Sequence, residues 1–347
     1  MGPGPRNLLT DVAGIKVGNA EDPARRTGVT VVVPDQPAVA AVDVRGGAPG
    51  TRETDALDPT CVVDGVHGIV LSGGSAFGLD AAGGLQGWLA ARGRGFRVGP
   101  AVVPIVPSAI LFDLLNGGDK DWGDRPPFRD LARQAADAAG DLFALGNAGA
   151  GLGATAGSLK GGLGSASLVA DFDGAAVTVA ALVAANPAGS TVMPGQSSFW
   201  AWALERDGEL GGQPAPSGAL ADLDYEFRLP GSIAKEGANT TLAVVATDAR
   251  LDKAQARRVA IMAHDGFARA IRPVHTPLDG DTAFALATGA VDLPNPVAGL
   301  ARLGMMAADC VARAVARGVY EADSLGDFPS YRAEHGHNLG HATGREG

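Results

Sequence analysis

Seven short apolar runs constrain the fold of this chain more than any other feature of its 347-residue sequence. Most of them are rich in valine or alanine, and apolar runs of this length between polar residues are typical of buried strands. They lie at residues 29–33, 38–44, 68–71, 102–106, 176–185, 242–246 and 282–287. None approaches the roughly 20 apolar residues that a membrane-spanning helix needs. The sequence therefore predicts sheets and no transmembrane segment.

Segments with apolar residues three or four positions apart predict helices between these strands. They cover residues 76–91, 128–145, 253–271 and 296–319. The third begins after Asp252, which has capping-box spacing to Gln255, and ends before Pro273. Because strands alternate with helices but several strands are consecutive, we expect a layered α/β or α+β protein with its helices outside the sheets.

Two polar, glycine- and proline-rich segments, 116–127 and 207–236, predict long loops, and the tail from about Asp327 is expected to be loose. The chain carries 28 basic and 38 acidic residues, so its formal net charge is −10. This balance argues against nucleic acid as a partner, because a phosphate backbone needs a basic face. Cys61 and Cys310 cannot form a disulfide framework, and the N-terminus lacks the pattern of a signal peptide. We expect a soluble, cytoplasmic protein.

The 51 glycines are concentrated in loops, which first suggests phosphate binding. The loop Gly73-Gly74-Ser75 follows a predicted strand and opens a predicted helix, but it lacks the Gly-Lys-Ser/Thr of a P-loop. Residues 151–156 fit G-x-G-x-x-A, yet further glycines and a strand follow them. A nucleotide-binding protein is therefore only an alternative. The Gly73–Ser75 loop instead predicts a nest of backbone N–H groups suited to a carboxylate or an oxyanion.

Motifs of common hydrolases and metal sites are missing from the sequence. It contains no G-x-S-x-G, no H-E-x-x-H and no paired C-x-x-C. His335, His337 and His341 have a spacing that could bind a metal, but no cysteine or carboxylate completes the set, so a solvated tail is expected. His67, His264 and His275 are scattered along the chain. Neither a metal enzyme nor an ordinary serine hydrolase is predicted.

A different chemistry is indicated by Asn239-Thr240-Thr241, at the junction of a long loop and a buried strand. A threonine there can attack its own preceding carbonyl, and water can then cleave the resulting ester. Thr240 would become a new N-terminus whose amine, with a pKa near ~8, serves as the base for its own hydroxyl. Taken alone, a threonine between a loop and a strand is common and need not be a nucleophile.

Three other sites could serve such a nucleophile. Asp279 and Asp281 can face one way on an extended chain and hydrogen-bond the amine and hydroxyl of Thr240, although Asp-Gly is also a common turn pair. Lys160 lies in a glycine run and is one of only five lysines, so it is either a fixed cation for developing negative charge or a surface charge. Asn186 offers an amide donor at a strand end, or simply begins an Asn-Pro turn.

Taken together, these segments resemble the self-cleaving L-aminopeptidase/D-esterase family, which includes β-peptidyl aminopeptidases and a nylon-oligomer endo-hydrolase. The resemblance covers nearly the whole chain as an ordered series of matches. The matching segments are 7–18, 42–47, 71–79, 104–113, 157–164, 237–242 and 278–282. An ordered series of this kind is far more specific than any one of its members.

The resemblance implies a fold and a set of roles. The fold would be a four-layer αββα sandwich, similar to the N-terminal-nucleophile hydrolases, in one domain built from two autocleaved chains. The cut between Asn239 and Thr240 would leave an α-chain of residues 1–239 and a β-chain of residues 240–347. Thr240 would be the nucleophile, Asp279 and Asp281 would orient its N-terminus, and Lys160 and Asn186 match positions tied to cleavage and to the oxyanion. The family forms homotetramers of processed heterodimers or larger rings, and it uses no cofactor or metal.

Two departures from the family pattern leave the substrate open. The nucleophile is threonine where aminopeptidase members usually carry serine, and Phe112 replaces a tyrosine that helps to hold the oxyanion in certain members. An aminopeptidase or amidase for short peptides, amides or esters is expected. The alternatives are an endo-hydrolase of linear oligoamides, an amine acyltransferase, and a non-catalytic scaffold. Glycines at 46–47, 73–74, 237 and 280 and around Lys160 are expected to gather about one site.

Overall fold

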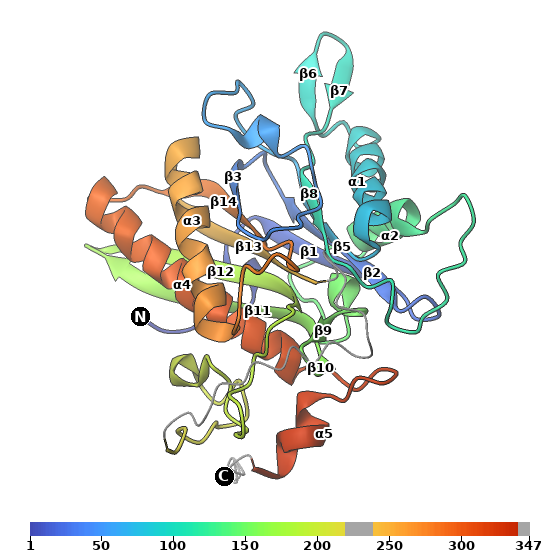
Figure 1. Cartoon of the computed structure of the whole chain (residues 1–347). Helices are drawn as coiled ribbons and strands as arrows, with labels where there is room; N and C mark the ends of the chain where they lie inside the picture. Colours follow the sequence, from blue (N-terminus) through green and yellow to red (C-terminus); the bar gives the residue numbers. More distant parts are fainter. Residues whose placement is uncertain (219–238, 339–347) are drawn as a thin grey trace, which may run out of the picture.

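Two five-stranded sheets lie face to face, and a pair of helices covers the outer face of each, in a computed structural model that describes residues 1–218 and 239–338 (Figure 1). Three clusters of buried apolar side chains fill the spaces between the four layers. One lies between α3, α4 and the first sheet, one between the two sheets, and one between the second sheet and α1 and α2. The expected four-layer αββα sandwich is confirmed.

The first sheet carries the predicted nucleophile. Its strands, in spatial order, are β11 (Gly162–Phe172), β12 (Ala175–Asn186), β13 (Thr240–Ala249), β14 (Thr282–Val291) and β3 (Val39–Val44). Neighbours pair antiparallel except β13 and β14, which run parallel with Leu242 opposite Thr282. Since β13 is the central strand, both of its faces are buried, which explains its continuous apolar sequence.

The second sheet has the order β1 (Ile15–Asp22), β2 (Thr27–Pro34), β5 (Ile69–Ser72), β8 (Ser108–Ile110) and β4 (Thr51–Arg52). Its pairs are antiparallel except β5 and β8. Two small hairpins lie outside the sheets: β6 (Phe96–Val98) with β7 (Ala101–Val103), and β9 (Thr155–Ala156) with β10 (Leu159–Lys160). The β6–β7 hairpin projects from the body beyond α1 (Figure 1).

The helices differ in how they begin. The α-helices are α1 (Ala81–Ala90), α2 (Phe128–Asp137), α3 (Lys253–Ala270), α4 (Pro296–Tyr320) and α5 (Tyr331–His335). Short 3₁₀ turns are η1 (Leu9–Asp11), η2 (Asp55–Leu57), η3 (Ser75–Asp80), η4 (Gly149–Gly151), η5 (Trp202–Leu204) and η6 (Gly336–Asn338). The predicted capping box of α3 is confirmed, since Asp252 and Gln255 bond each other's backbone N–H groups. Asn295 caps α4, with Pro296 in its first turn.

Several predicted boundaries were wrong. The helix expected over 76–91 begins as the 3₁₀ turn η3, and the one expected over 128–145 ends at Asp137, where a glycine follows three residues later. The run 102–106 forms a strand only to Val103, in an exposed hairpin. The expected loose tail from Asp327 is ordered as far as the described residues go, because the Tyr331 side chain is fully buried and stacks on Phe199.

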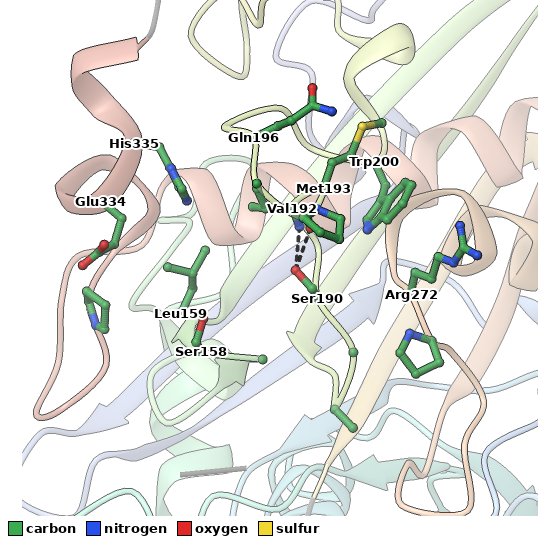
Figure 2. Close-up of a pocket in the computed structure, with 17 residues that line it drawn as sticks. Ser158, Leu159, Ser190, Val192, Met193, Gln196, Trp200, Arg272, Glu334 and His335 are labelled. Carbon is green, nitrogen blue, oxygen red and sulfur yellow. Dashed lines mark hydrogen bonds between the residues drawn. The ribbon is translucent and has the colours of Figure 1, made fainter. Parts of the chain in front are cut away.

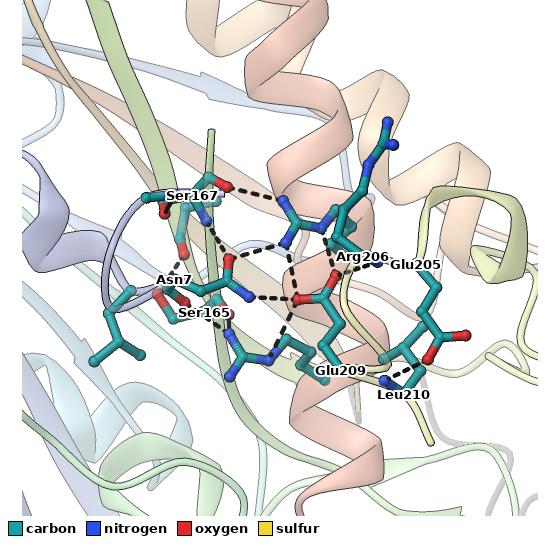
Figure 3. Close-up of polar contacts among 12 residues, drawn as sticks. Asn7, Ser165, Ser167, Glu205, Arg206, Glu209 and Leu210 are labelled. Atoms are coloured by element: carbon teal, nitrogen blue, oxygen red, sulfur yellow. Dashed lines mark hydrogen bonds and ion pairs between the residues drawn. The ribbon is translucent and has the colours of Figure 1, made fainter. Parts of the chain in front are cut away.

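A buried ionic network fastens the N-terminal segment to α4 and to the loop after η5 (Figure 3). Glu209, whose side chain is 6% exposed, binds the guanidinium of Arg313 through both oxygens at 2.5 and 2.9 Å. Asn7 donates to Glu209 and accepts from Arg313. Three segments distant in sequence are therefore joined by charge-assisted hydrogen bonds.

Among the described residues, no helix combines the length and the apolar character that crossing a bilayer requires.

Candidate active site

Thr240 begins the central strand of the first sheet, and the pairing of that strand decides what surrounds it. Asn186 lies directly opposite Thr240 in the β12–β13 register. Because β13 and β14 are parallel, the residues that precede β14 come to the same end of the sheet, and Asp279 bridges Asn239 there. The structure thus brings three predicted residues, Asn186, Asn239 and Asp279, together around a threonine that is only 2% exposed.

The peptide bond between Asn239 and Thr240 is held from both sides. The hydroxyl of Thr240 donates a hydrogen bond to the carbonyl oxygen of Asn239, the group it would attack. The backbone N–H of Gly280 donates to the same oxygen at 3.0 Å. A Cβ at residue 280 would lie 2.7 Å from both the Thr240 hydroxyl and the Ala48 carbonyl oxygen, so only glycine brings the backbone this close.

The two carboxylates bind groups on either side of Thr240. Asp281 accepts a 2.7 Å hydrogen bond from the N–H of Thr241. Asp279 accepts from the N–H of Ala188 at 3.0 Å and from the hydroxyl of Thr276 at 2.5 Å. Burial, together with the neighbouring charge of Asp281, raises the pKa of Asp279. The pair is therefore a desolvated acidic site at the end of the sheet where β13 begins.

Lys160 ends the short strand β10 and is 1% exposed. Its ammonium donates to the carbonyl oxygens of Gly151 and Gly161, both at 2.9 Å. Burial lowers the pKa of Lys160 to about 7, and the Asp113 carboxylate opposes that shift. A group with this pKa can change its charge near neutrality, which is uncommon for lysine and typical of functional sites.

Asn186 joins Thr240, its partner in the β12–β13 register, to the predicted oxyanion loops. Its Nδ2 donates to the carbonyl oxygen of Phe112 at 3.1 Å, and its Oδ1 accepts from the N–H of Thr155 at 2.8 Å. Phe112 therefore contributes its backbone rather than its ring to this contact. Because an amide nitrogen carries two hydrogens, Asn186 keeps one donor beyond the bond to Phe112.

Only one N–H of the Gly73-Gly74-Ser75 loop binds a carboxylate, and that carboxylate belongs to the chain itself. The N–H of Gly74 donates to Asp113 at 2.8 Å, and the N–H of Ser75 donates to the Leu111 carbonyl oxygen at 3.0 Å. The carboxylate of Asp113, a residue 3% exposed, also accepts from the Thr27 hydroxyl at 2.5 Å. Burial raises the pKa of Asp113 despite Lys120 at 3.9 Å.

Asp113, His275 and Thr276 are residues of this region that sequence reasoning missed. Asp113 lies within the matching segment 104–113, which was the only sign of it, because its partners Thr27 and Gly74 are 86 and 39 residues away. The Thr276-x-x-Asp279 spacing is typical of a local side-chain-to-backbone turn and could have indicated the Thr276 contact. His275 had no such sign, since its bond to Asp281 depends on a left-handed backbone.

A cavity of about 810 Å³ opens beside these residues (Figure 2). Leu159, next to Lys160, and Ala188, whose N–H binds Asp279, form part of its wall. Val192, Met193 and Trp200 give it an apolar side. Arg272, Glu334 and His335 add charged or polar groups. The cavity is large enough for a small-molecule ligand.

The histidines of the tail are separated by their positions. His335 lines the cavity, His337 lies in η6, and His341 falls outside the described residues. In the part of the chain that the structure describes, no group of three or more His, Cys, Asp or Glu side chains is placed to hold a metal ion. Gly46, Gly161 and Gly280 each approach residues of the site closely, whereas Gly237 also lies outside the described part.

The chain is similar to known aminopeptidases and to an oligoamide hydrolase. The chain is 46% identical to an uncharacterized aminopeptidase of Mycobacterium tuberculosis, over 94% of this chain and 97% of the relative. It is 30% identical to the 6-aminohexanoate-oligomer endohydrolase of a Kocuria species, over 84% and 78%. Its fold is similar to the L-aminopeptidase D-Ala-esterase/amidase of Ochrobactrum anthropi, with a TM-score of 0.69, 24% identity and coverage of 93% and 88%. It is also similar to the fold of a Burkholderia β-aminopeptidase, with a TM-score of 0.67, 24% identity and coverage of 93% of this chain and 89% of the other.

The solved neighbours establish the fold, and that of Ochrobactrum is described as a variant of the N-terminal-nucleophile hydrolase fold. The family assignment rests on the sequence. The profile of peptidase family S58 matches residues 7–331, which is nearly the whole chain. The chain belongs to peptidase family S58 and is a hydrolase of peptide or amide bonds.

Proposed function

We propose that the chain is a self-processing aminopeptidase or amidase that cuts itself between Asn239 and Thr240 and then uses Thr240 as its nucleophile. One observation carries the proposal: the Thr240 hydroxyl is bonded to the carbonyl of its own preceding residue. The residues on either side of Thr240 contact the two carboxylate residues, since Asn239 pairs with Asp279 and the Thr241 N–H donates to Asp281. Residues 1–239 form the α-chain and residues 240–347 the β-chain of one domain.

Processing begins with attack by the Thr240 hydroxyl oxygen on the carbonyl carbon of Asn239. The C–N bond breaks, the hydroxyl proton ends on the Thr240 nitrogen, and an ester remains. Water then cleaves the ester, which leaves a carboxylate on Asn239 and a free amine and hydroxyl on Thr240. The products have the composition of the precursor plus one water molecule.

In turnover, the Thr240 amine takes the proton of its own hydroxyl as the oxygen attacks the substrate amide. The Lys160 ammonium and the second Nδ2 hydrogen of Asn186 stabilise the negative charge on the substrate oxygen. Asp279 and Asp281 bind the Thr240 amine whenever it is protonated. No cofactor or metal takes part in these steps, so EDTA is expected to leave the rate unchanged.

The substrate is a short peptide, amide or ester, and the cavity beside Asp279 receives its side chain or leaving group. The relatives with 46% identity are named aminopeptidases, which favours release of N-terminal residues. Hydrolysis inside linear oligoamides is the second candidate, because Thr240 replaces serine and relatives at 30–31% identity are named 6-aminohexanoate-oligomer endohydrolases. Assays of amino-acid p-nitroanilides against 6-aminohexanoate oligomers separate the two. Transfer to an added amine would indicate an acyltransferase.

Denaturing electrophoresis tests the central claim. With 34.8 kDa for 347 residues, the 239- and 108-residue products correspond to about 24 and 11 kDa. The wild-type protein is expected to show both bands, and Thr240→Ala to remain one inactive chain. An uncut wild-type protein with full activity would contradict the proposal. A wild-type protein that shows both bands but hydrolyses no substrate would also contradict it, and would favour the non-catalytic scaffold.

Assembly and location complete the proposal. We propose that the protein works in the cytoplasm, which the two free cysteines, Cys61 and Cys310, support. We propose a homo-oligomer, a tetramer of processed heterodimers. The exposed apolar side chains of the β6–β7 hairpin, Phe96, Val98 and Val103, support such an interface. Light scattering gives the oligomer mass, and replacing these three side chains with serine is expected to lower it.

A further inference from the structure

His275 and Thr276 fasten both carboxylates of the site with four hydrogen bonds. The backbone N–H and Nδ1 of His275 donate to Asp281 Oδ2 at 3.1 and 2.8 Å. The backbone N–H and hydroxyl of Thr276 donate to Asp279 Oδ2 at 3.2 and 2.5 Å. The other oxygen of each carboxylate accepts from a backbone N–H, that of Ala188 at Asp279 and that of Thr241 at Asp281. The His275–Thr276 dipeptide therefore fixes the orientation of both carboxylates.

The turn held in this way carries the Gly280 N–H that donates to the Asn239 carbonyl oxygen. The other side of the turn is fixed as well. The backbone N–H of Ala48 donates to the Asp279 carbonyl oxygen at 2.8 Å, and the backbone N–H of Arg45 donates to the Asp281 carbonyl oxygen at 3.0 Å. The direction of one N–H group at the scissile bond is therefore set by contacts on both faces of a three-residue turn.

The His275 ring is itself held in place by α3. It lies edge-on to His264 and Phe267, with ring centroids 4.8 and 6.1 Å away. His264 is fixed in turn, because its Nε2 lies 3.0 Å from the carbonyl oxygen of Asp43 and must be the donor there. His275 also has a φ of +54°, a left-handed conformation that is uncommon for residues other than glycine.

We propose that the Gly280 N–H is the oxyanion donor of self-cleavage and that His275 and Thr276 are the positioning residues that aim it. This proposal rests on the self-cleavage proposed above. When the Thr240 oxygen bonds to the Asn239 carbonyl carbon, the carbonyl electron pair moves to the oxygen, and the Gly280 N–H already points at that oxygen. Collapse of the intermediate returns the pair, breaks the C–N bond and releases the Thr240 nitrogen with the proton of the former hydroxyl.

The experiment follows the rate at which freshly made precursor is converted into two bands, per unit of folded protein. Thr276→Val removes the hydroxyl bond to Asp279 with little change of shape, and is expected to slow cleavage about tenfold or more, because misaimed groups at a reacting bond cost up to about 100-fold. Thr276→Ser keeps the hydroxyl and should cleave at close to the wild-type rate.

Two further variants separate positioning from stability. Thr247→Val is the matched control. It removes a buried hydroxyl bond to the carbonyl oxygen of Thr178 at the end of β13 far from Thr240. It should lower the melting temperature and leave the cleavage rate unchanged. His275→Asn keeps a side-chain donor and tolerates the left-handed backbone, whereas His275→Gly keeps only the backbone. The glycine variant is expected to cleave more slowly than the asparagine variant.

The outcomes distinguish the two proposals. A wild-type precursor that never cleaves overturns the proposed function. A wild type that cleaves, with Thr276→Val and His275→Gly equally fast, overturns the positioning role alone. Should those variants fail to fold, the crystal structure of the Thr240→Ala precursor decides instead: the Gly280 N–H is expected on the Asn239 carbonyl oxygen, and a carbonyl turned away from Gly280 overturns the proposal.

Discussion

At the scale of single residues, Lys160 is the least ordinary group in the molecule. It is fully buried, it binds two carbonyl oxygens, and burial brings its pKa to about 7. The two glycines that follow it pack closely against backbone, since a Cβ at Gly161 or Gly162 would lie 2.2 Å from the carbonyl oxygen of Ala185 or Gly318. Its charge at neutral pH therefore depends on small changes in pH, and both catalysis and stability should reflect that.

The stability of the protein should increase with pH because of Lys160. The pKa is about 7 in the folded protein and 10.5 in the unfolded chain, so between these values the unfolded chain binds more protons. The free energy of unfolding then rises with pH, by at most about 3 kcal/mol between pH 7 and 9. Urea titrations at several pH values measure this slope. Lys160→Met should flatten it, and an unchanged slope would show that Lys160 is not the source.

The same variant bears on catalysis. If the Lys160 ammonium stabilises the oxyanion, Lys160→Met should lower kcat about 100-fold. Wild-type kcat should fall as pH rises above about 7, because the ammonium is lost there. The Thr240 amine, with a pKa near ~8, makes the rate rise over the neighbouring range, so the profile is bell-shaped. Rates that rise monotonically to pH 9 would argue against the cationic role.

At the scale of elements, α4 lies unusually close to β11. A Cβ at Gly164 would lie 1.9 Å from the carbonyl oxygen of Ala314, and the backbone has no room to yield because the strand is paired along its length. Gly164→Ala is therefore expected to destabilise the protein by about 1–3 kcal/mol. Gly140→Ala is the control, since a Cβ there meets nothing within 4 Å. Denaturant midpoints of the two variants provide the comparison.

The ionic network of α4 should behave as a buried pair. Removing Glu209 leaves the Arg313 guanidinium, 1% exposed, without its carboxylate, and costs about 3–5 kcal/mol. Glu209→Ala should therefore lower the melting temperature far more than Arg206→Ala, a change at an exposed residue of the same loop. A small effect at Glu209 would show that Asn7 and Ser167 suffice to satisfy Arg313.

Which elements the sequence could predict depends on how each is buried. The runs around β2, β12, β13 and β14 were found because strands covered on both faces are apolar throughout. Strand β11 was missed because Gly162, Gly164 and two serines interrupt its sequence, the glycines to admit α4. Strand β1 was missed because half-buried Lys16 and Asn19 and exposed Glu21 interrupt its buried residues.

The site shows the same limit. Thr240 and the Asp279/Asp281 pair were predicted because each directly precedes a buried strand, and two parallel strands bring such positions together. Asp113 depends on partners far along the chain, and His275 on one backbone angle and the packing of α3. Neither leaves a periodic or local pattern in the sequence, so geometry alone reveals them.

At the scale of the whole molecule, the β-chain should stay bound to the α-chain after the proposed cut. Strand β13 would begin the β-chain, yet it lies between β12 of the α-chain and β14 of its own. The two chains should therefore elute as one species in native size-exclusion chromatography and separate only in denaturant. The uncut Thr240→Ala protein is the control for mass. Two native peaks would show that the sheet opens after cleavage.

The position of the Asp279–Asp281 turn also sets when the chain can be cut. Thr241 and Asp281 are bonded although 40 residues apart, and Gly280 reaches the bond that precedes Thr240. A ribosome must finish that stretch, and the sheet must close, before the scissile carbonyl has its donor. If the chain cuts itself as proposed, cleavage therefore reports that folding is complete, and a truncated or misfolded copy would keep the Thr240 nitrogen in its peptide bond and stay inactive.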